Sequence, residues 1–565
     1  MKKLSKIFLG GTLLASVALI GCSSDTASAE KDVATESEAG EEDVTEEKVE
    51  EVEASDGNHI TGDVLVKNVN ARKAIAVGYD ESYITEEILA DGSISADYYV
   101  PVNYAKNPEG NDYRDGVDSY LVYDVEKAKE YWETAKSELG FETAEFTILN
   151  YDNESSKKIG EFLKSELEQN LEGLTVNVEM VPSQQKLERS RNGEFDVELA
   201  GWSPVYLDGV AFLGKWTSDS AYNSGGYVSD EYDSLVNGVY SSVEERYEGL
   251  IEAERILLEE DAAIAPIYQG NKSFLDNREV SVITSHPFGA HFTYEWTELD
   301  REDKVLKLLE SSKVPTMDNS LATDSVSFNI ITSITDGLVS LGEEGGNIIP
   351  SLAESWDVSD DGLTYTFHIR KDATFVNYLG EVVGDVTAQS FVDSWERLEN
   401  PETGASNAYL VRDVANMDTY TAVDDYTLEV VLTKDTPWFL SILTFGPFNP
   451  IHKESVDAFG DTYGTTLETT ISCGPFYLTD WNFSERVIIT KNPHYYDADN
   501  IKLDGVNFRI IEGVENETAV NMYFAGELDR VPLTGENVEI YSGHEDLTEV
   551  IQARINYLVF NIDDN

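Results

Sequence analysis

Cysteine, histidine and basic residues are scarce in this chain of 565 residues. Forty Lys and Arg face 107 Asp and Glu, which gives a formal net charge of -67. Because contacts to nucleic-acid phosphates need a basic face, this balance excludes a nucleic-acid partner. The seven His residues lack paired metal-ligand spacing such as HExxH, the two Cys residues form no cluster, and no Walker A or GxSxG sequence is present. We therefore expect a protein that is not an enzyme and that uses no metal and no cofactor.

Long hydrophobic runs are absent except at the N-terminus. There a lysine-rich start precedes an apolar stretch over 7–20, which is too short for a membrane span and is typical of a secretion signal. The sequence Leu-Ile-Gly-Cys over 19–22 resembles the lipobox of bacterial lipoproteins, which implies that 1–22 is a lipoprotein signal peptide and that Cys22 carries a diacylglycerol. The alternative is an ordinary signal peptide with an incidental Cys22. Cys473 then has no disulfide partner and is expected to be a small buried residue.

The segment 23–58 almost lacks large apolar residues and is dense in Glu. Such a sequence cannot bury enough surface to offset its ordering entropy, so we expect a disordered, acidic tether. No later segment is apolar over the length that a bilayer requires. The lipid on Cys22 is therefore the only membrane attachment that the sequence predicts.

The rest of the chain has the composition of a folded protein with large cores, since 41% of all residues are hydrophobic and 11% are aromatic. A single core rarely grows past about 250–300 residues, so two or three lobes are expected. Helical patterns over 124–139 and 155–169 alternate with strand-like runs over 144–150 and 174–181, which is typical of an α/β lobe.

Beyond residue 303 strand-like runs become denser and helices fewer, which predicts an α+β half. The clearest of these runs lie over 363–370, 426–432, 485–490 and 505–511. No internal repeat relates the two halves, so they are expected to be different lobes rather than copies.

Several segments of this second half resemble the N-terminal half of the oligopeptide-binding proteins of ABC importers, the family 5 solute-binding proteins. They include IIPSLAESWDVSDDGLTYTFHIRKDATF (348–375), SCGPFYLTDW (472–481) and KNPHYYDADNIKLDGVNFRII (491–511). The first half resembles the C-terminal half of the same family through NARKAIAVGYDESYI (70–84), GEFDVELAGWSPVY (193–206) and HPFGAHFTYEW (286–296). The halves stand in the reverse of the usual order, so the sequence resembles a circularly permuted member.

The resemblance implies a two-lobed periplasmic-binding-protein-like fold of type II, cluster C, that combines α/β and α+β parts and carries an extra small domain. It assigns 60–268 to the α/β lobe, 269–345 and 456–565 to the other main lobe, and 346–455 to the extra small domain. In this architecture the ligand lies between two lobes that close around it.

The resemblance also points to ligand-binding residues in the segment that follows residue 200. Gly201 is expected to let the ligand backbone approach, Trp202 to form an apolar wall, and Tyr206 to offer a ring and a hydroxyl, with Ser203 between them. The family commonly has Asp, an anchor for the ligand ammonium, at the position of Val205. Valine cannot serve this role, and Asp208 is the nearby candidate replacement.

In the other lobe, Val314 lies in a stretch that resembles a strand pairing with the ligand backbone, and Tyr409 resembles an aromatic wall of the pocket. Four cations are further candidates for a ligand carboxylate, namely Lys157, Lys158, Arg189 and Arg191. Each of these side chains has an ordinary structural alternative, core packing for the aromatic residues and solvated surface charge for the cations.

The resulting hypothesis is a monomeric, lipid-anchored binding protein on the outer face of the cytoplasmic membrane. It would capture short peptides and deliver them to the permease and ATPase subunits of an ABC importer. The alternatives are a receptor for a signalling peptide, a surface chaperone or adhesin without transport function, and a rearranged inactive remnant. Binding of short peptides separates the first two from the last two.

Overall fold

The computed structural model describes residues 58–563, apart from 205, 221, 287–290 and 344–346. The predicted signal peptide with Cys22, the tether up to residue 57 and Val205 therefore lie outside the described residues. None of the helices in the described part combines the length and apolar character needed to cross a bilayer. Helices and strands are mixed in both halves, which confirms the expected combination of α/β and α+β parts.

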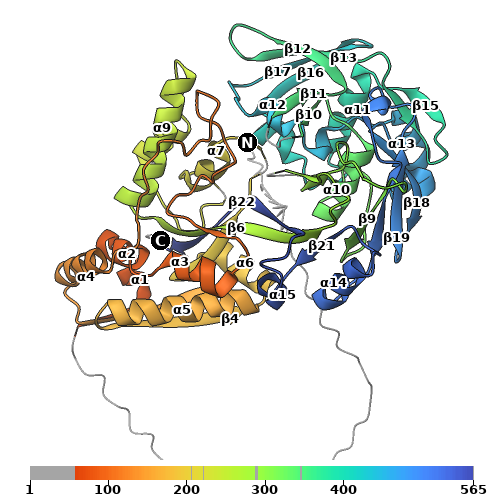
Figure 1. Cartoon of the computed structure of the whole chain (residues 1–565). Helices are drawn as coiled ribbons and strands as arrows, with labels where there is room; N and C mark the ends of the chain where they lie inside the picture. The colour runs from red at the N-terminus through yellow and green to blue at the C-terminus, as the bar shows by residue number, and fades with distance from the viewer. Residues whose placement is uncertain (1–57, 205, 221, 287–290, 344–346, 564–565) are drawn as a thin grey trace, which may run out of the picture.

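An eight-stranded sheet runs through the first half, with helices above and below it (Figure 1). Its strands run in the order β1-β3-β5-β22-β6-β2, with β4 beside β3 and β21 beside β6. The strands β3, β4 and β5 are parallel, as expected where helices connect successive strands. The bounds are β1 His59–Ile60, β2 Ile94–Ser95, β3 Thr143–Tyr151, β4 Leu174–Val181, β5 Val197–Trp202, β6 Ile264–Asp276, β21 Arg530–Leu533 and β22 Leu547–Phe560.

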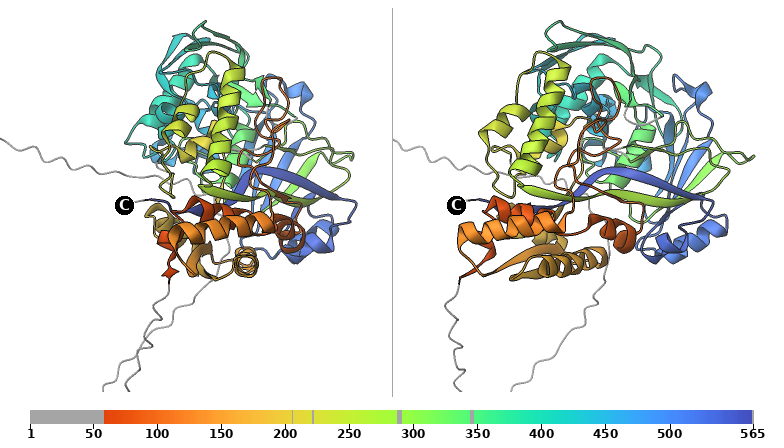
Figure 2. Two further views of the ribbon diagram at one scale, coloured as in Figure 1. Left: turned by 90° about the vertical axis from the view of Figure 1, so that its left-hand side faces the viewer. Right: turned by 60° about the vertical axis from the view of Figure 1, so that its left-hand side comes forward.

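Two hydrophobic cores cover the two faces of this sheet, and Figure 2 shows the helical layers on opposite sides of it. One core packs α2 (Val69–Ala76), α4 (Val125–Leu139) and α5 (Glu154–Asn170) against the sheet. The other contains α7 (Val210–Leu213) and α9 (Val243–Arg255). The shorter helices of this lobe are α1 (Gly62–Leu65), α3 (Glu81–Tyr83), α6 (Ser183–Arg191) and α8 (Asp230–Val236).

Helix α4 shows how the local sequence sets these elements. Its buried residues Ala128, Trp132 and Ala135 recur every three or four positions and therefore lie on one face. The carboxylate of Asp124 accepts the N–H groups of the first turn at 3.0 and 3.1 Å, which caps the helix. Gly140 ends it with φ 74°, a left-handed conformation that glycine adopts without strain.

The second half gathers two four-stranded sheets around one core. The order is β18-β19-β20-β9 in one sheet and β12-β13-β17-β16 in the other. The bounds are β9 Val305–Glu310, β12 Ala353–Val358, β13 Thr364–Ile369, β16 Met417–Asp424, β17 Thr427–Leu432, β18 Phe476–Asn482, β19 Arg486–Lys491, β20 Gly505–Ile510, α10 Ser325–Ile334, α11 Ala388–Glu399, α12 Phe439–Ile442, α13 Lys453–Phe459, α14 Asn516–Phe524 and α15 Glu536–Ile540.

Three short hairpin strand pairs complete this half, β7 (Thr284–Ser285) with β8 (Phe292–Thr293), β10 (Val339–Leu341) with β11 (Ile348–Pro350), and β14 (Thr374–Val376) with β15 (Val382–Asp385). The segment 346–455, expected as an extra small domain, shares the core of its neighbours. Its Phe367 and Trp395 belong to the same hydrophobic cluster as Leu306 and Phe508. Cys473 is buried in this cluster as a free cysteine.

The long strands β6 and β22 run side by side between the two halves (Figure 1). One end of the pair lies beside β21, and the pairing is interrupted by a bulge between Ile551 and Ile555. Sequence reasoning grouped the last residues of β22 with the other lobe in 456–565, and this needs correction. Residues 555–560 pair with β5 of the α/β lobe, because their alternating side chains fill both cores of that sheet.

Candidate ligand-binding site

The segment after β5 carries the predicted aromatic wall. Strand β5 ends at Trp202, shortly before Pro204, which lacks the N–H needed to continue the ladder. The half-buried Trp202 donates its indole N–H to the Ala211 carbonyl at 2.7 Å, and its ring lies 5.2 Å from that of Tyr222. Trp202 is thus held at the carboxyl end of a strand parallel to β3, the end at which open α/β sheets bind ligands.

The ammonium group of Lys215 lies over the same ring. Its nitrogen is 5.4 Å from the ring centre of Trp202 and 4.2 Å from that of Trp216. Burial lowers the pKa of Lys215 to about 7, although the charge of Glu198 opposes this effect. The wall beside Trp202 therefore carries only a partial positive charge at neutral pH.

Tyr206 and Leu207 of the α/β lobe contact the other lobe. The ring of Tyr206 stacks on Trp438 with centroids 5.1 Å apart and planes 23° apart. The backbone N–H of Leu207 donates to the Ser441 hydroxyl at 3.0 Å. The hydroxyl of Tyr104 donates to the Tyr206 carbonyl and so anchors the turn that contains Tyr206 and Leu207. The predicted segment therefore lies where the two lobes meet.

Asp208, the candidate replacement for an ammonium anchor, is already engaged. Its Oδ1 accepts a hydrogen bond from Arg246 at 2.6 Å and another from the backbone N–H of Val210 at 2.9 Å. The side chains of Asp208 and Arg246 are 11% and 22% exposed, so the pair is largely shielded from water. This carboxylate is neutralised and fixes the turn rather than facing a ligand.

The guanidinium of Arg554 occupies the space beside Gly201. A Cβ at this position would overlap the guanidinium of Arg554 and lie 2.7 Å from the Asn556 amide oxygen. The same guanidinium donates to the Ser203 hydroxyl at 3.5 Å. Gly201 was expected to admit the ligand backbone, and in the structure its missing side chain admits Arg554 from the neighbouring strand.

The two predicted residues of the other lobe have different surroundings. The Val314 side chain is fully buried in the core, so only its backbone can face a ligand. Tyr409 is half-buried, and burial followed by the nearby Tyr222 raises the pKa of its phenol to about 12. Tyr222 in turn packs against Trp202, so Tyr222 contacts Trp202 with its ring and interacts with Tyr409 through its phenol.

The four candidate cations from the first half are not part of this cluster. Lys158 lies 3.7 Å from Glu154 and Arg189 lies 2.7 Å from Glu179, both at the surface of the α/β lobe. Lys157 and Arg191 are exposed on the same two helices, α5 and α6. They match the ordinary alternative of solvated surface charge.

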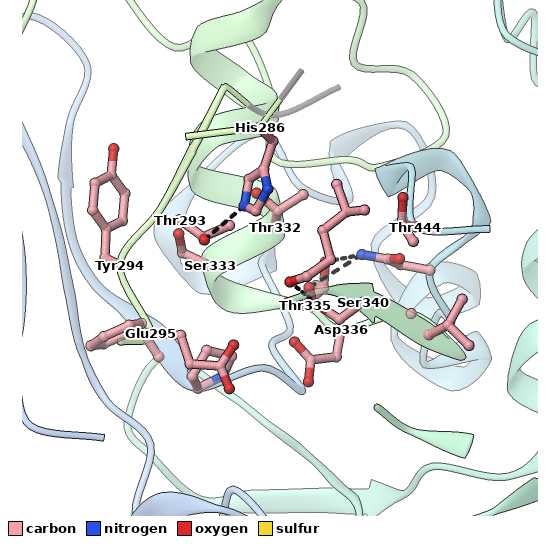
Figure 3. A pocket seen from close by; sticks show the side chains of 16 residues that line it. His286, Thr293, Tyr294, Glu295, Thr332, Ser333, Thr335, Asp336, Ser340 and Thr444 are labelled. Carbon is pink, nitrogen blue, oxygen red and sulfur yellow. Dashed lines mark hydrogen bonds between the residues drawn. The ribbon is translucent and has the colours of Figure 1, made fainter. Parts of the chain in front are cut away.

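A separate small cavity lies inside the other lobe, and Figure 3 shows its polar lining. Its volume of about 40 Å³ suits one or two water molecules and not a ligand of several residues. The Tyr495 hydroxyl donates to Asp336 at 2.8 Å and lies 3.3 Å from Glu295. Burial and the nearby Asp336 raise the pKa of Glu295 to about 8, and burial raises the pKa of Asp336 to about 6.

This carboxylate pair predicts a measurable pH dependence. A carboxyl whose pKa rises on folding binds its proton more tightly in the native state, so stability falls as the pH rises from about 4.5 to 8. Glu295→Gln removes this effect and is expected to raise the free energy of unfolding by roughly 1–3 kcal/mol at pH 8 and to change it little at pH 4.5. Urea unfolding at both pH values measures this, with exposed Glu298→Gln as control. An equal gain at both pH values contradicts the assignment.

Three contacts of the site were not found by sequence reasoning, those of Tyr222, Trp438 and Arg554. No spacing rule in the sequence links Trp438 to Tyr206. Arg554 lies more than 350 residues from Ser203 in sequence and reaches it only because β22 pairs with β5. In the described ranges no group of three or more His, Cys, Asp or Glu is arranged to hold a metal ion.

Comparison with known proteins gives two kinds of match. The model for bacterial extracellular solute-binding proteins, family 5 Middle, matches residues 40–224 and 347–565. The dipeptide-binding protein DppE of Bacillus subtilis is 31% identical over 273 residues, which are 46% of this chain and 48% of DppE. The periplasmic oligopeptide-binding protein OppA of Escherichia coli is 29% identical over 242 residues, 40% of this chain and 43% of OppA. The chain spans about half the length of these curated relatives.

Solved structures give matches of the same extent. Listeria monocytogenes OppA bound to peptide is 30% identical, with a TM-score of 0.40, and the match covers 43% of this chain and 49% of that one. The substrate-binding domain of an oligopeptide ABC transporter from Bacillus anthracis is 35% identical, with a TM-score of 0.40 and coverage of 43% and 48%.

The two ranges that the family model matches together make up more than half of the chain. The family consists of binding proteins rather than enzymes. The protein therefore belongs to the bacterial extracellular solute-binding proteins of family 5.

Proposed function

We propose that the protein captures short peptides between its two lobes and delivers them to an ABC importer. The observation that carries this proposal is the aromatic cluster of Trp202, Tyr222, Tyr409, Tyr206 and Trp438 at the meeting of two separate cores. Fixed aromatic rings supply contact area at low entropic cost and accept many side chains. Opening of the lobes would expose these rings, and closure around a peptide would cover them again.

The backbone groups of 312–314, in the lobe that contains Tyr409 and Trp438, support recognition of an extended peptide. In the part of the chain that the structure describes, the N–H and C=O groups of 312–314 make no backbone hydrogen bond. The segment continues from β9, whose ladder with β20 ends at Glu310. A peptide in extended conformation beside 312–314 would satisfy these groups whatever its side chains are.

The relatives extend the proposal to location and partners. DppE and OppA carry the names of a dipeptide-binding and an oligopeptide-binding protein, and AliB of Streptococcus pneumoniae that of an oligopeptide-binding protein. A lipid on Cys22 would hold the monomeric protein on the outer face of the cytoplasmic membrane. Permease and ATPase subunits would then take up the peptide that it releases.

Native mass spectrometry of the purified protein with a mixed pool of dipeptides to pentapeptides tests the function. Many bound peptide masses are the expected result. One retained sequence from the pool would favour a signalling-peptide receptor. A folded protein that retains no peptide would overturn the proposal and favour a surface chaperone, an adhesin or an inactive remnant.

The order of the halves is a further part of the proposal. Phe560, at the end of β22, shares a core with Ala71 and Ile75 of α2, the helix that follows this strand in the usual family order. The Arg72 guanidinium donates to the Ala262 carbonyl at 3.0 Å, beside the carbonyl to which the Phe560 N–H donates. This closeness supports a circular permutation, because the ends to be joined are neighbours.

Restoring the usual order tests the permutation. A chain in which 303–562 precedes 59–301 is expected to keep the fold, with a thermal midpoint within a few degrees of the natural order, because the packed residues are unchanged. Circular dichroism and calorimetry measure both properties. A reordered chain that fails to fold contradicts the proposed arrangement.

A further inference from the structure

Two cations on the strands that connect the lobes differ from several shielded arginines of this protein that are paired with a carboxylate. The guanidinium groups of Arg301, Arg397 and Arg530 each lie 2.5 or 2.6 Å from a carboxylate. Arg554 on β22 and Lys272 on β6 form no such ion pair within the described ranges, although Asp and Glu outnumber Lys and Arg by 107 to 40. In so acidic a chain, two neighbouring cations without an ion pair in the described ranges favour an anionic ligand as their partner.

The donors of both side chains are nearly unused. A guanidinium has five N–H donors. Among the residues that the structure describes, the Arg554 side chain donates only to the Ser203 hydroxyl, at the long distance of 3.5 Å, and the Lys272 ammonium donates to none. Both residues are half-buried, so water can satisfy these donors only in part.

The carboxyl that interacts with Lys272, that of Glu310, does not neutralise this pair. Burial, followed by the positive charge of Arg554, lowers the pKa of Lys272, while Glu310 acts in the opposite direction. Burial raises the pKa of Glu310 to about 8, so at pH 7 this carboxyl is mostly protonated. Within the described residues, neither Arg554 nor Lys272 has a carboxylate ion pair, and Glu310 supplies little counter-charge at this pH.

The fold places these cations next to the aromatic site. The bulge of β22 between Ile551 and Ile555 precedes the pairing of Asn556 with Gly201 on β5. Because Gly201 has no side chain, the Arg554 guanidinium lies over the backbone of β5 and reaches toward Ser203, the residue after Trp202. The adjacent strand β6 contributes Lys272, close enough to Arg554 for the two charges to interact.

We propose that Arg554 and Lys272 bind a carboxylate of the captured peptide. A guanidinium binds a carboxylate through two parallel hydrogen bonds, and an ammonium adds a point charge. The inference rests on the proposed function and deepens it, because it predicts a preference for peptides with a free C-terminus or an acidic side chain. It also gives Gly201 a role, since any larger residue there would displace the Arg554 guanidinium.

The test compares three peptide pools on the purified protein by competition in native mass spectrometry. The first pool holds tripeptides without Asp or Glu as free acids, the second the same tripeptides as C-terminal amides, and the third amides that contain one Glu. The natural protein is expected to prefer the first pool over the second by about tenfold. Arg554→Gln is expected to remove this preference, Arg554→Lys to retain part of it, and Lys272→Met to reduce it.

Arg486→Gln is the matched control, because Arg486 pairs with Asp480 on the distant β18–β19 hairpin. Thermal unfolding checks that every variant is folded, and Arg554→Lys keeps the charge should Arg554→Gln not fold. A preference for the third pool over the second that Arg554→Gln removes also supports the proposal and identifies an acidic side chain as the source. Equal binding of all pools by the natural protein and by Arg554→Gln overturns the inference and leaves peptide binding intact. Failure of the natural protein to bind any pool overturns the proposed function, and this inference with it.

Discussion

Replacing Lys186 with methionine is expected to lower the free energy of unfolding of the α/β lobe by about 3–5 kcal/mol. The Lys186 ammonium lies 2.5 Å from a carboxylate oxygen of Glu198, and both side chains are only 1% exposed. Methionine keeps most of the apolar volume and removes the charge. The carboxylate of Glu198 would then be buried without its cation, which costs far more than the pair itself contributes.

Glu198 also connects three parts of the lobe that hold the candidate site. It lies on β5, four residues before Trp202, and accepts hydrogen bonds from the Ser190 and Ser224 hydroxyls, each at 2.9 Å. Lys186 comes from α6 and also lies 4.8 Å from the centre of the Tyr151 ring. Loss of the ion pair is therefore expected to loosen α6 and the 224 loop against β5.

Calorimetry measures the effect as a fall of roughly 10 °C in the unfolding midpoint of the lobe. Lys158→Met is the matched control, because Lys158 lies 3.7 Å from Glu154 with both side chains more than half exposed, and its loss is expected to cost under about 0.5 kcal/mol. The double substitution Lys186→Met with Glu198→Leu is expected to recover part of the stability, since it removes the unpaired charge. A Lys186→Met variant as stable as Lys158→Met would show that the buried pair is not needed.

The periodic elements of the fold could be predicted from the sequence almost to the residue. The helix expected over 124–139 is Val125–Leu139, because its apolar spacing, its Asp124 cap and Gly140 agree. The strand expected over 174–181 is Leu174–Val181, where polar and apolar residues alternate. The end of β22 could not be assigned in this way, since its pairing with β5 bridges more than 350 residues.

The candidate site could also be predicted only in part, because motifs identify single residues and not the contacts that depend on tertiary packing. Trp202, Tyr206 and Tyr409 were predicted from motifs. The structure places Tyr206 against Trp438 of the other lobe and links Trp202 to Tyr409 through Tyr222, and the role of all three in binding stays a prediction. The engagement of Asp208 by Arg246 could not be predicted, because it depends on how α9 packs against the turn after β5. Arg554 was missed for a similar reason, since nothing in the local sequence of β22 distinguishes it from a solvated arginine.

Trp202→Ala is expected to weaken peptide binding by roughly 50-fold, about 2–3 kcal/mol, the usual loss at a central aromatic anchor. The substitution removes the ring that packs on Tyr222, whose centre is 5.2 Å away, and leaves the Ala211 carbonyl without its indole donor. Lys215 would also lose one of the two rings over which its ammonium lies. Titration calorimetry with a peptide identified from the mixed pool measures the change.

Two further variants separate a binding role for Trp202 from a general cost of losing a tryptophan. Trp202→Phe keeps a flat apolar ring and loses only the indole N–H, so its affinity is expected to stay within about fivefold of the natural protein. Trp481→Ala removes a half-buried tryptophan that stacks on Phe483 at the edge of the other lobe, and it should alter stability without altering affinity. Equal affinities for Trp202→Ala and Trp481→Ala would remove Trp202 from the binding site, because the ring would then serve packing alone.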